Sequence, residues 1–152
     1  MIPKAFFVTG GKAIGKVSKM NTFDLALKNA GIANCNIVKV SSIIPPNCEE
    51  TSPREMPTGG ITYAVISKAD GEGERITAGI AWGFARDKRL GVVAEAYGSM
   101  DEAAAKRMLD ERIMEMANTR GIDLCDVKYR IETVDVPKGS YGCAVVALVY
   151  LF

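Results

Sequence analysis

The sequence predicts an α+β fold in which a largely antiparallel sheet is covered by helices. Segments rich in β-branched residues arrive mostly in runs, and only two stretches have the apolar spacing of a helix. With 152 residues, the chain has the length of one domain, which we expect to span residues 1–152. We find no internal repeat and no linker that would divide it.

The N-terminal part is predicted to form a strand, a helix and a second strand. Lys4 to Thr9 forms the first strand, which leads into a flexible glycine turn from Gly10 to Gly15. The helix opens at Asn21, a residue type that caps helices, and stops at Gly31. A buried strand from Asn36 to Ser42 follows.

The glycine turn has the spacing of a phosphate-binding loop, because Gly10 and Gly15 are separated by four residues and Lys16 follows. That reading fails at its last position. Val17 stands where a Ser or Thr hydroxyl would hold magnesium, so we interpret the stretch as a turn.

The middle of the chain is predicted to hold a long loop and three strands. The loop from Pro45 to Gly60 contains four prolines, which sustain neither a helix nor a central strand. The strands are expected over Ile61 to Lys68, Arg75 to Phe84 and Leu90 to Tyr97. Asp70 to Gly73 is interpreted as a hairpin turn between the first two.

The C-terminal part is predicted to hold the longest helix and two more strands. Ser99 and Glu102 have the spacing of a capping box, and the helix they open is expected to end at Arg120. The strands Lys128 to Val136 and Tyr141 to Phe152 are joined by a short turn.

Composition excludes several functional classes. A net charge of +1 provides no basic excess for binding nucleic acid or an anionic membrane. The longest apolar run, Cys143 to Phe152, is too short to span a bilayer, and the Met1 end has no signal peptide, so we expect a cytoplasmic protein. The four cysteines form no Cys-x-x-Cys and are predicted to be free thiols. The absence of histidine excludes Ser-His-Asp triads, Cys-His dyads and His-Glu-x-x-His zinc sites.

Three places carry residues suited to chemistry, and each has a second interpretation. Ser41 and Ser42 precede a Pro-Pro pair, a pattern that also fits an ordinary strand-to-loop junction. Glu95 interrupts an apolar strand, where the alternation of side chains can direct it to solvent or into a cleft. In a cleft, desolvation would raise the pKa of its carboxyl group and let it act as a general acid near neutral pH. Asp24 can complement the helix dipole or accept two hydrogen bonds from a guanidinium.

The ordered set of motifs resembles the pyruvoyl-dependent arginine decarboxylases of archaea and some bacteria. The resemblance begins at Asn21-Thr22-Phe23-Asp24-x-Ala26-Leu27 and includes Val40-Ser41-Ser42-Ile43-Ile44-Pro45-Pro46. It continues through Met56-Pro57-x-Gly59, Glu95-x-Tyr97-Gly98 and Gly142-Cys143-Ala144, and so covers nearly the whole chain.

The resemblance implies an enzyme that makes its own cofactor. The Ser42 hydroxyl would attack the carbonyl of Ser41, the peptide would rearrange to an ester, and β-elimination would yield a β chain, 1–41, and an α chain, 42–152. Asn36 would help to position and polarise the scissile carbonyl. Ser42 would remain as a covalent pyruvoyl group, and neither a metal nor pyridoxal phosphate is expected.

The resemblance also implies the substrate, the other site residues and the assembly. Arginine would form a Schiff base with the pyruvoyl group, which would act as electron sink in its conversion to agmatine and CO2. Glu95 would protonate the α-carbon, Asp24 would bind the guanidinium, and Leu27 and Ile43 would line the aliphatic part of the pocket. The implied fold is an αββα sandwich, assembled as a trimer or a dimer of trimers with active sites between subunits.

Two alternative functions are compatible with the same residues. A chain that keeps the fold but is not cleaved would serve as a binding or assembly subunit. A cleaved chain with a different pocket would decarboxylate another amino acid. In each case we expect no nucleic-acid partner and no membrane partner.

Overall fold

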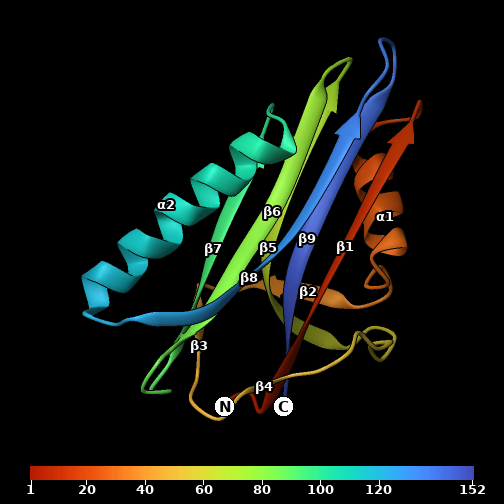
Figure 1. Ribbon diagram of the computed structural model, residues 1–152. Helices are drawn as coiled ribbons and strands as arrows, with labels where there is room; N and C mark the ends of the chain where they lie inside the picture. The colour runs from red at the N-terminus through yellow and green to blue at the C-terminus, as the bar shows by residue number, and fades with distance from the viewer.

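A computed structural model describes residues 1–152. It consists of two packed β-sheets with one helix on the outer face of each, which makes four layers (Figure 1). The α+β class, the αββα sandwich and the mostly antiparallel pairing are therefore confirmed. None of the helices combines the length and the apolar character needed to cross a membrane.

The first sheet, called sheet 1, contains five strands in the order β2-β5-β9-β1-β4. They are β1 (Ala5–Gly15), β2 (Asn36–Lys39), β4 (Glu49–Glu50), β5 (Ile61–Glu72) and β9 (Tyr141–Leu151). Strand β9 is antiparallel to both of its neighbours, whereas the short edge strands β2 and β4 run parallel to theirs. Helix α1 (Lys19–Asn29) packs on β1 and β9.

The second sheet, called sheet 2, contains four antiparallel strands in the order β3-β7-β6-β8. They are β3 (Ile43–Ile44), β6 (Arg75–Ala85), β7 (Gly91–Gly98) and β8 (Leu124–Asp135). Helix α2 (Glu102–Arg120) covers the outer face of sheet 2 with a buried stripe of four residues, Ala105, Leu109, Ile113 and Ala117.

Apolar side chains fill the spaces between all four layers. Phe6, Val65 and Leu148 from sheet 1 meet Ile80 and Val93 from sheet 2 in the central layer. Separate clusters join α1 to sheet 1 and α2 to sheet 2. Strand β9 is buried on both faces, which explains the continuous apolar run at the C-terminal end of the sequence.

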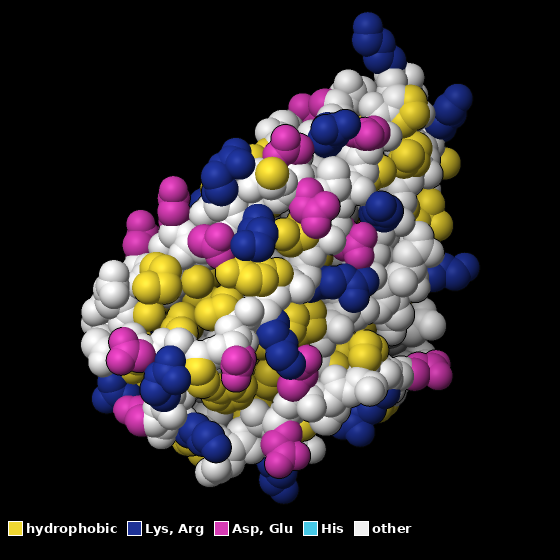
Figure 2. Space-filling model, viewed as in Figure 1, with side chains coloured by type: hydrophobic (Ala, Val, Ile, Leu, Met, Phe, Trp, Pro, Cys, Tyr) yellow, Lys and Arg dark blue, Asp and Glu magenta, His cyan; other side chains and the backbone are white.

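The surface has mixed charge. Figure 2 shows Lys and Arg side chains interspersed with Asp and Glu over the viewed face. This face therefore presents no extended area of a single sign, in agreement with the net charge of +1.

The predicted glycine turn is wrong, because Gly10 to Gly15 continue β1. This part of β1 pairs with β9 residue by residue, from Gly10 opposite Val146 to Gly15 opposite Tyr141. Glycine is needed at position 11, where α1 approaches the strand so closely that no side chain fits.

The predicted hairpin at Asp70 to Gly73 is also wrong. The strand that begins at Ile61 extends to Glu72, and β5 and β6 lie in different sheets. The tight turn, with Gly73 at φ 63°, therefore carries the chain from sheet 1 to sheet 2. The turn between β8 and β9 carries it back. Alternating patterns do not distinguish a hairpin from a turn between packed sheets.

Helix α1 begins earlier than predicted. Its cap is Ser18, whose Oγ accepts a hydrogen bond from the Asn21 backbone N–H at 3.0 Å. The predicted stop is confirmed, with Gly31 in the left-handed region at φ 80°. Because the helix starts at Lys19, Asp24 lies beyond the first turn, where the helix dipole offers it little stabilisation.

Helix α2 ends as predicted but has a different cap. Gly121 is left-handed at φ 60° and terminates the helix. The N-cap is Asp101, whose carboxylate accepts from the Ala104 N–H at 2.8 Å. Ser99 instead donates a hydrogen bond to Glu74 at 2.6 Å, so the predicted capping box is wrong.

Alanine at Gly11 is expected to lower the free energy of unfolding by about 2 kcal/mol, a typical cost of overpacking. Its Cβ would lie 2.4 Å from the Ala26 carbonyl oxygen and 2.6 Å from the Ala30 nitrogen, both backbone atoms of the α1 segment. Urea unfolding measures the change. Gly15→Ala is the matched control, because its Cβ would first meet the Thr22 hydroxyl, at 3.2 Å. Equal stability of Gly11→Ala and the wild type would contradict this account of α1 packing.

Candidate active site

Ser41 and Ser42 lie where the chain leaves sheet 1 and enters sheet 2 (Figure 1). The predicted strand from Asn36 to Ser42 is shorter than expected, because β2 ends at Lys39 and the next strand, from Ile43, belongs to the other sheet. Three of the four β2 residues are exposed, so the prediction that this strand is buried is wrong. The serine pair thus connects an edge strand of each sheet.

The backbone is anchored on both sides of the peptide between Ser41 and Ser42. Upstream, the Val40 N–H donates to the Ala64 carbonyl of β5 at 3.0 Å. Downstream, the Val93 N–H of β7 donates to the Ser42 carbonyl at 2.9 Å. The intervening peptide group forms no hydrogen bond within the chain, and neither serine hydroxyl forms one. This peptide is therefore held by its neighbours, while its own N–H and carbonyl are unpaired.

Glu95 lies in the same cavity as Ser42. The cavity has a volume of about 360 Å³ and is lined by Ser42, Glu95, Tyr97 and Arg112, among others. Because side chains alternate along a strand, Glu95 is on the same face of β7 as Val93, which packs between the sheets. Its side chain is only 19% exposed, so the geometry supports the cleft interpretation over the solvent one.

The charge of Glu95 is set by opposing effects. Burial raises the pKa of its carboxyl group above the ordinary value, while the Lys39 ammonium and the Arg112 guanidinium favour the ionised form. Lys39 Nζ lies 3.7 Å from Glu95 Oε2, and Arg112 donates a hydrogen bond to the Glu95 carbonyl oxygen. Burial dominates, so the protonated form persists to higher pH than for an exposed glutamate.

Lys39 and Arg112 were not predicted as site residues. Lys39 precedes Ser42 by three positions, which is the one signal in the sequence that could have indicated it. Arg112 comes from α2, and nothing in the helical spacing shows that it reaches β7. Each reaches Glu95 only through tertiary packing, Lys39 from the edge of sheet 1 and Arg112 from the helix outside sheet 2.

Asn36 and Ile43 lie on either side of the serine pair. The Asn36 amide donates to the Gly59 carbonyl at 2.9 Å, not to the Ser41 carbonyl. No hydrogen bond joins it to the Ser41 carbonyl, so its contribution to cleavage stays a prediction. Ile43 is 40% exposed and, with Ser41, lines an apolar groove of about 390 Å³ beside the two chain ends.

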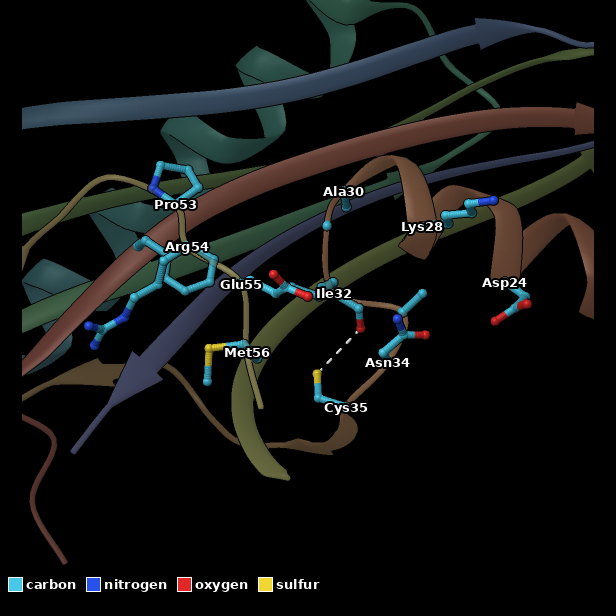
Figure 3. Close-up of a pocket in the computed structure, with 13 residues that line it drawn as sticks. Asp24, Lys28, Ala30, Ile32, Asn34, Cys35, Pro53, Arg54, Glu55 and Met56 are labelled. Carbon is cyan, nitrogen blue, oxygen red and sulfur yellow. Dashed lines mark hydrogen bonds between the residues drawn. The ribbon is translucent and has the colours of Figure 1, made fainter. Parts of the chain in front are cut away.

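Asp24 and Leu27 lie elsewhere, on α1. Asp24 is exposed and lines a cavity of about 670 Å³ formed by α1, the turn after it and the loop around Glu55 (Figure 3). Leu27 packs against the cluster between α1 and sheet 1. Figure 3 shows Glu55 directed toward the turn at Ile32 and Arg54 directed away from it.

The predicted site residues therefore form two groups within one chain. Ser42 and Glu95 share a cavity that α2 helps to line, whereas Asp24 lines a cavity on α1. Two sheets lie between these helices, and stacked sheets are about 10 Å apart. A single arginine cannot contact both cavities of the same chain.

Comparisons with known proteins give a consistent result. The family model described as pyruvoyl-dependent arginine decarboxylase matches residues 5–152. A pyruvoyl-dependent arginine decarboxylase of Methanopyrus kandleri is 34% identical over 149 residues, which cover 98% of this chain and 97% of the relative. That of Methanocaldococcus jannaschii is 32% identical, with 96% and 88% coverage. Pyruvoyl-dependent arginine decarboxylase 2 of Archaeoglobus fulgidus is 37% identical, with 74% and 78% coverage.

Replacement of Lys39 by methionine is expected to raise the pKa of Glu95 further, because the ammonium that favours the carboxylate is lost. A carboxyl group with a raised folded-state pKa stabilises the fold below its unfolded value, near 4.5, and loses this contribution as the pH rises through the folded value. The variant should therefore lose more stability than the wild type as the pH rises from about 4 to about 8.

Urea unfolding at a series of pH values measures this difference. Lys16→Met is the matched control, since Lys16 is exposed and forms no ion pair. In a Glu95→Gln background, Lys39→Met should no longer change the pH dependence. If the difference persists in that background, Lys39 does not act through Glu95.

Proposed function

The chain belongs to the pyruvoyl-dependent arginine decarboxylase family, and we propose that it cuts its own backbone between Ser41 and Ser42 before acting on substrate. Family membership makes it a carboxy-lyase, and conversion of L-arginine to agmatine and CO2 is the expected reaction. One observation carries the self-cleavage proposal: the peptide between the serines is unpaired, between two anchored strand edges, beside a half-buried Glu95.

The surroundings of Ser42 fit the pyruvoyl group that the family implies. The Ser42 carbonyl, which would become the amide neighbour of the new ketone, accepts the Val93 N–H at 2.9 Å. The serine side chain opens into a cavity of about 360 Å³, where Glu95 provides a carboxyl group with raised pKa. A carbonyl at this position would thus face a proton donor.

Formation of the group needs only this chain and water. Ser42 Oγ attacks the Ser41 carbonyl carbon; its proton passes to the Ser42 nitrogen as an ester C–O bond replaces the amide C–N bond. Loss of the Ser42 α-proton then expels the Ser41 carboxylate from Cβ, leaving a dehydroalanine. Water replaces the nitrogen, which leaves as ammonia, and no oxidant or reductant is required. Asn36 would polarise the Ser41 carbonyl through its side-chain amide, which has a second N–H besides the one that Gly59 accepts.

A pyruvoyl carbonyl would supply an electrophile for the α-amine of the substrate and an electron sink for the loss of CO2. The chain's own residues do the rest. Glu95 holds a proton in the Ser42 cavity and delivers it to the α-carbon, a task favoured by its raised pKa. Asp24 accepts the guanidinium hydrogen bonds, while Leu27 and Ile43 contact the aliphatic part of the substrate.

We further propose that each active site forms between two copies of the chain. Because Asp24 and Ser42 line separate cavities, arginine bound at Ser42 meets Asp24 and Leu27 of a neighbouring copy. A trimer, or a dimer of trimers, would provide such contacts. The carboxylate that binds the guanidinium of arginine would thus come from a different chain than the Ser42 that reacts with it.

Intact-mass measurement tests self-cleavage. The wild type should yield two fragments, 1–41 and 42–152, the larger with a borohydride-sensitive end, whereas Ser42→Ala should remain one chain because the nucleophile is gone. Ser52→Ala, in the exposed loop, is the control and should cleave like the wild type. A single wild-type mass after long incubation would instead favour an uncleaved binding or assembly subunit.

Replacement of Asp24 by asparagine is expected to lower kcat/KM for arginine by about 100-fold, the value of a lost charge-assisted hydrogen-bond pair. Release of CO2 from arginine, lysine, ornithine and histidine measures the preference. The loss should be largest for arginine, since only arginine carries a guanidinium. Asp87→Asn, at an exposed position outside both cavities, is the control. An equal loss for all four amino acids would exclude Asp24 as the guanidinium partner.

A further inference from the structure

Tyr150 contacts the backbone at Ile43, the second residue after the proposed cleavage point. Its hydroxyl donates a hydrogen bond to the Ile43 carbonyl oxygen at 2.7 Å. Tyr150 belongs to β9 in the middle of sheet 1, and Ile43 belongs to β3 at the edge of sheet 2. Tyr150 is only 5% exposed and Ile43 is 40% exposed, so this contact is a partly buried tie between the two sheets.

We propose that Tyr150 is a positioning residue for self-cleavage, which holds Ile43 so that the Ser42 hydroxyl stays within reach of the Ser41 carbonyl. This inference rests on the proposed self-cleavage at Ser42. Tyr150 does not line the cavity of Ser42 and Glu95. It therefore acts through the backbone and not by contact with the substrate.

The geometry of β3 explains why this carbonyl needs a side-chain partner. Strand β3 is an edge strand of two residues and pairs only with β7. Successive carbonyls of an extended chain point to opposite sides, so the Ser42 carbonyl, directed at β7, leaves the Ile43 carbonyl directed away from it. No strand of sheet 2 is available on that side, and the Tyr150 hydroxyl takes the position of the missing donor.

Three contacts then limit the motion of the reacting segment. Val40 is held by Ala64 of sheet 1, Ser42 by Val93 of sheet 2, and Ile43 by Tyr150. Attack requires the hydroxyl oxygen to stay about 3–3.5 Å from the carbonyl carbon. Without the Tyr150 tie, hydrogen bonds hold the two-residue strand from β7 alone, and the reactive arrangement is populated less often.

The Tyr150 hydroxyl stays protonated and can therefore donate this hydrogen bond throughout the reaction. Burial raises the pKa of Tyr150, with the nearby Cys48 adding to the effect, so the hydroxyl keeps its proton. The ring packs in the central layer with Phe6 and Ile44. Its position is therefore fixed by core packing, independently of the bond to Ile43.

Tyr150→Phe removes the oxygen and keeps the ring, and the first-order rate constant of fragment formation measures the effect. We expect cleavage about tenfold slower than in the wild type, equivalent to about 1.4 kcal/mol in the activation barrier. Tyr63→Phe is the matched control. Tyr63 and Tyr150 both line the apolar groove beside the two chain ends, and the centroids of the Tyr63 and Phe152 rings are 5.7 Å apart, but the Tyr63 hydroxyl forms no hydrogen bond. This control should cleave at the wild-type rate.

A second measurement separates positioning from loss of structure. Rates are normalised to the folded fraction, measured by near-ultraviolet circular dichroism at the assay temperature.

A hydroxylamine experiment identifies the step that is slowed. Hydroxylamine, which cleaves esters but not amides, should not accelerate fragment formation in Tyr150→Phe, because the slowed step is ester formation itself. A hydroxylamine-sensitive intermediate that accumulates would overturn the proposal.

The remaining outcomes distinguish this inference from the proposed function. Cleavage of Tyr150→Phe at the wild-type rate would overturn the role of Tyr150 and leave self-cleavage standing. Equal slowing in Tyr63→Phe would also overturn it, because the groove and not the hydrogen bond would then matter. Absence of cleavage in the wild type would overturn both.

Discussion

Packing of the two sheets against each other is the constraint on which the rest of the structure depends. The central apolar layer between Phe6, Val65 and Leu148 on one side and Ile80 and Val93 on the other holds the two sheets face to face. Each connection between them then has to cross at a sheet end or a sheet edge. The crossing from β2 to β3 joins two edge strands, so its peptide has no ladder partner.

That edge is also where charge can be partly buried. Glu95 continues the inward face of β7 beyond the short partner strand β3, which leaves its carboxylate between apolar neighbours and the open edge. Lys39 reaches this carboxylate from sheet 1, and Arg112 from α2 donates to the Glu95 backbone carbonyl. The same lack of edge cover thus gives both an unpaired peptide at Ser42 and a carboxyl group with a raised pKa beside it.

Local chemistry made part of this protein predictable from its sequence. Gly31 and Gly121 ended the helices as expected, because glycine adopts the left-handed conformation without strain. The ordered motifs around Asp24, Ser42 and Glu95 indicated the family. The N-caps were misjudged, since Ser18 and Asp101 compete with nearby residues of equal capping ability. The glycine turn was misjudged because only packing shows that Gly11 makes room for α1.

The sequence by itself determined the approximate places of the two helices and the long strands, the absence of histidine chemistry and the family, since these depend on residue identity and local order. The tertiary structure decided which strands share a sheet, because a turn at Gly73 looks the same whether it closes a hairpin or joins two sheets. It also decided that Lys39 meets Glu95, that Tyr150 meets Ile43, and that Asp24 stays apart from Ser42. These relations join residues far apart in the chain, and only the packing of layers sets them.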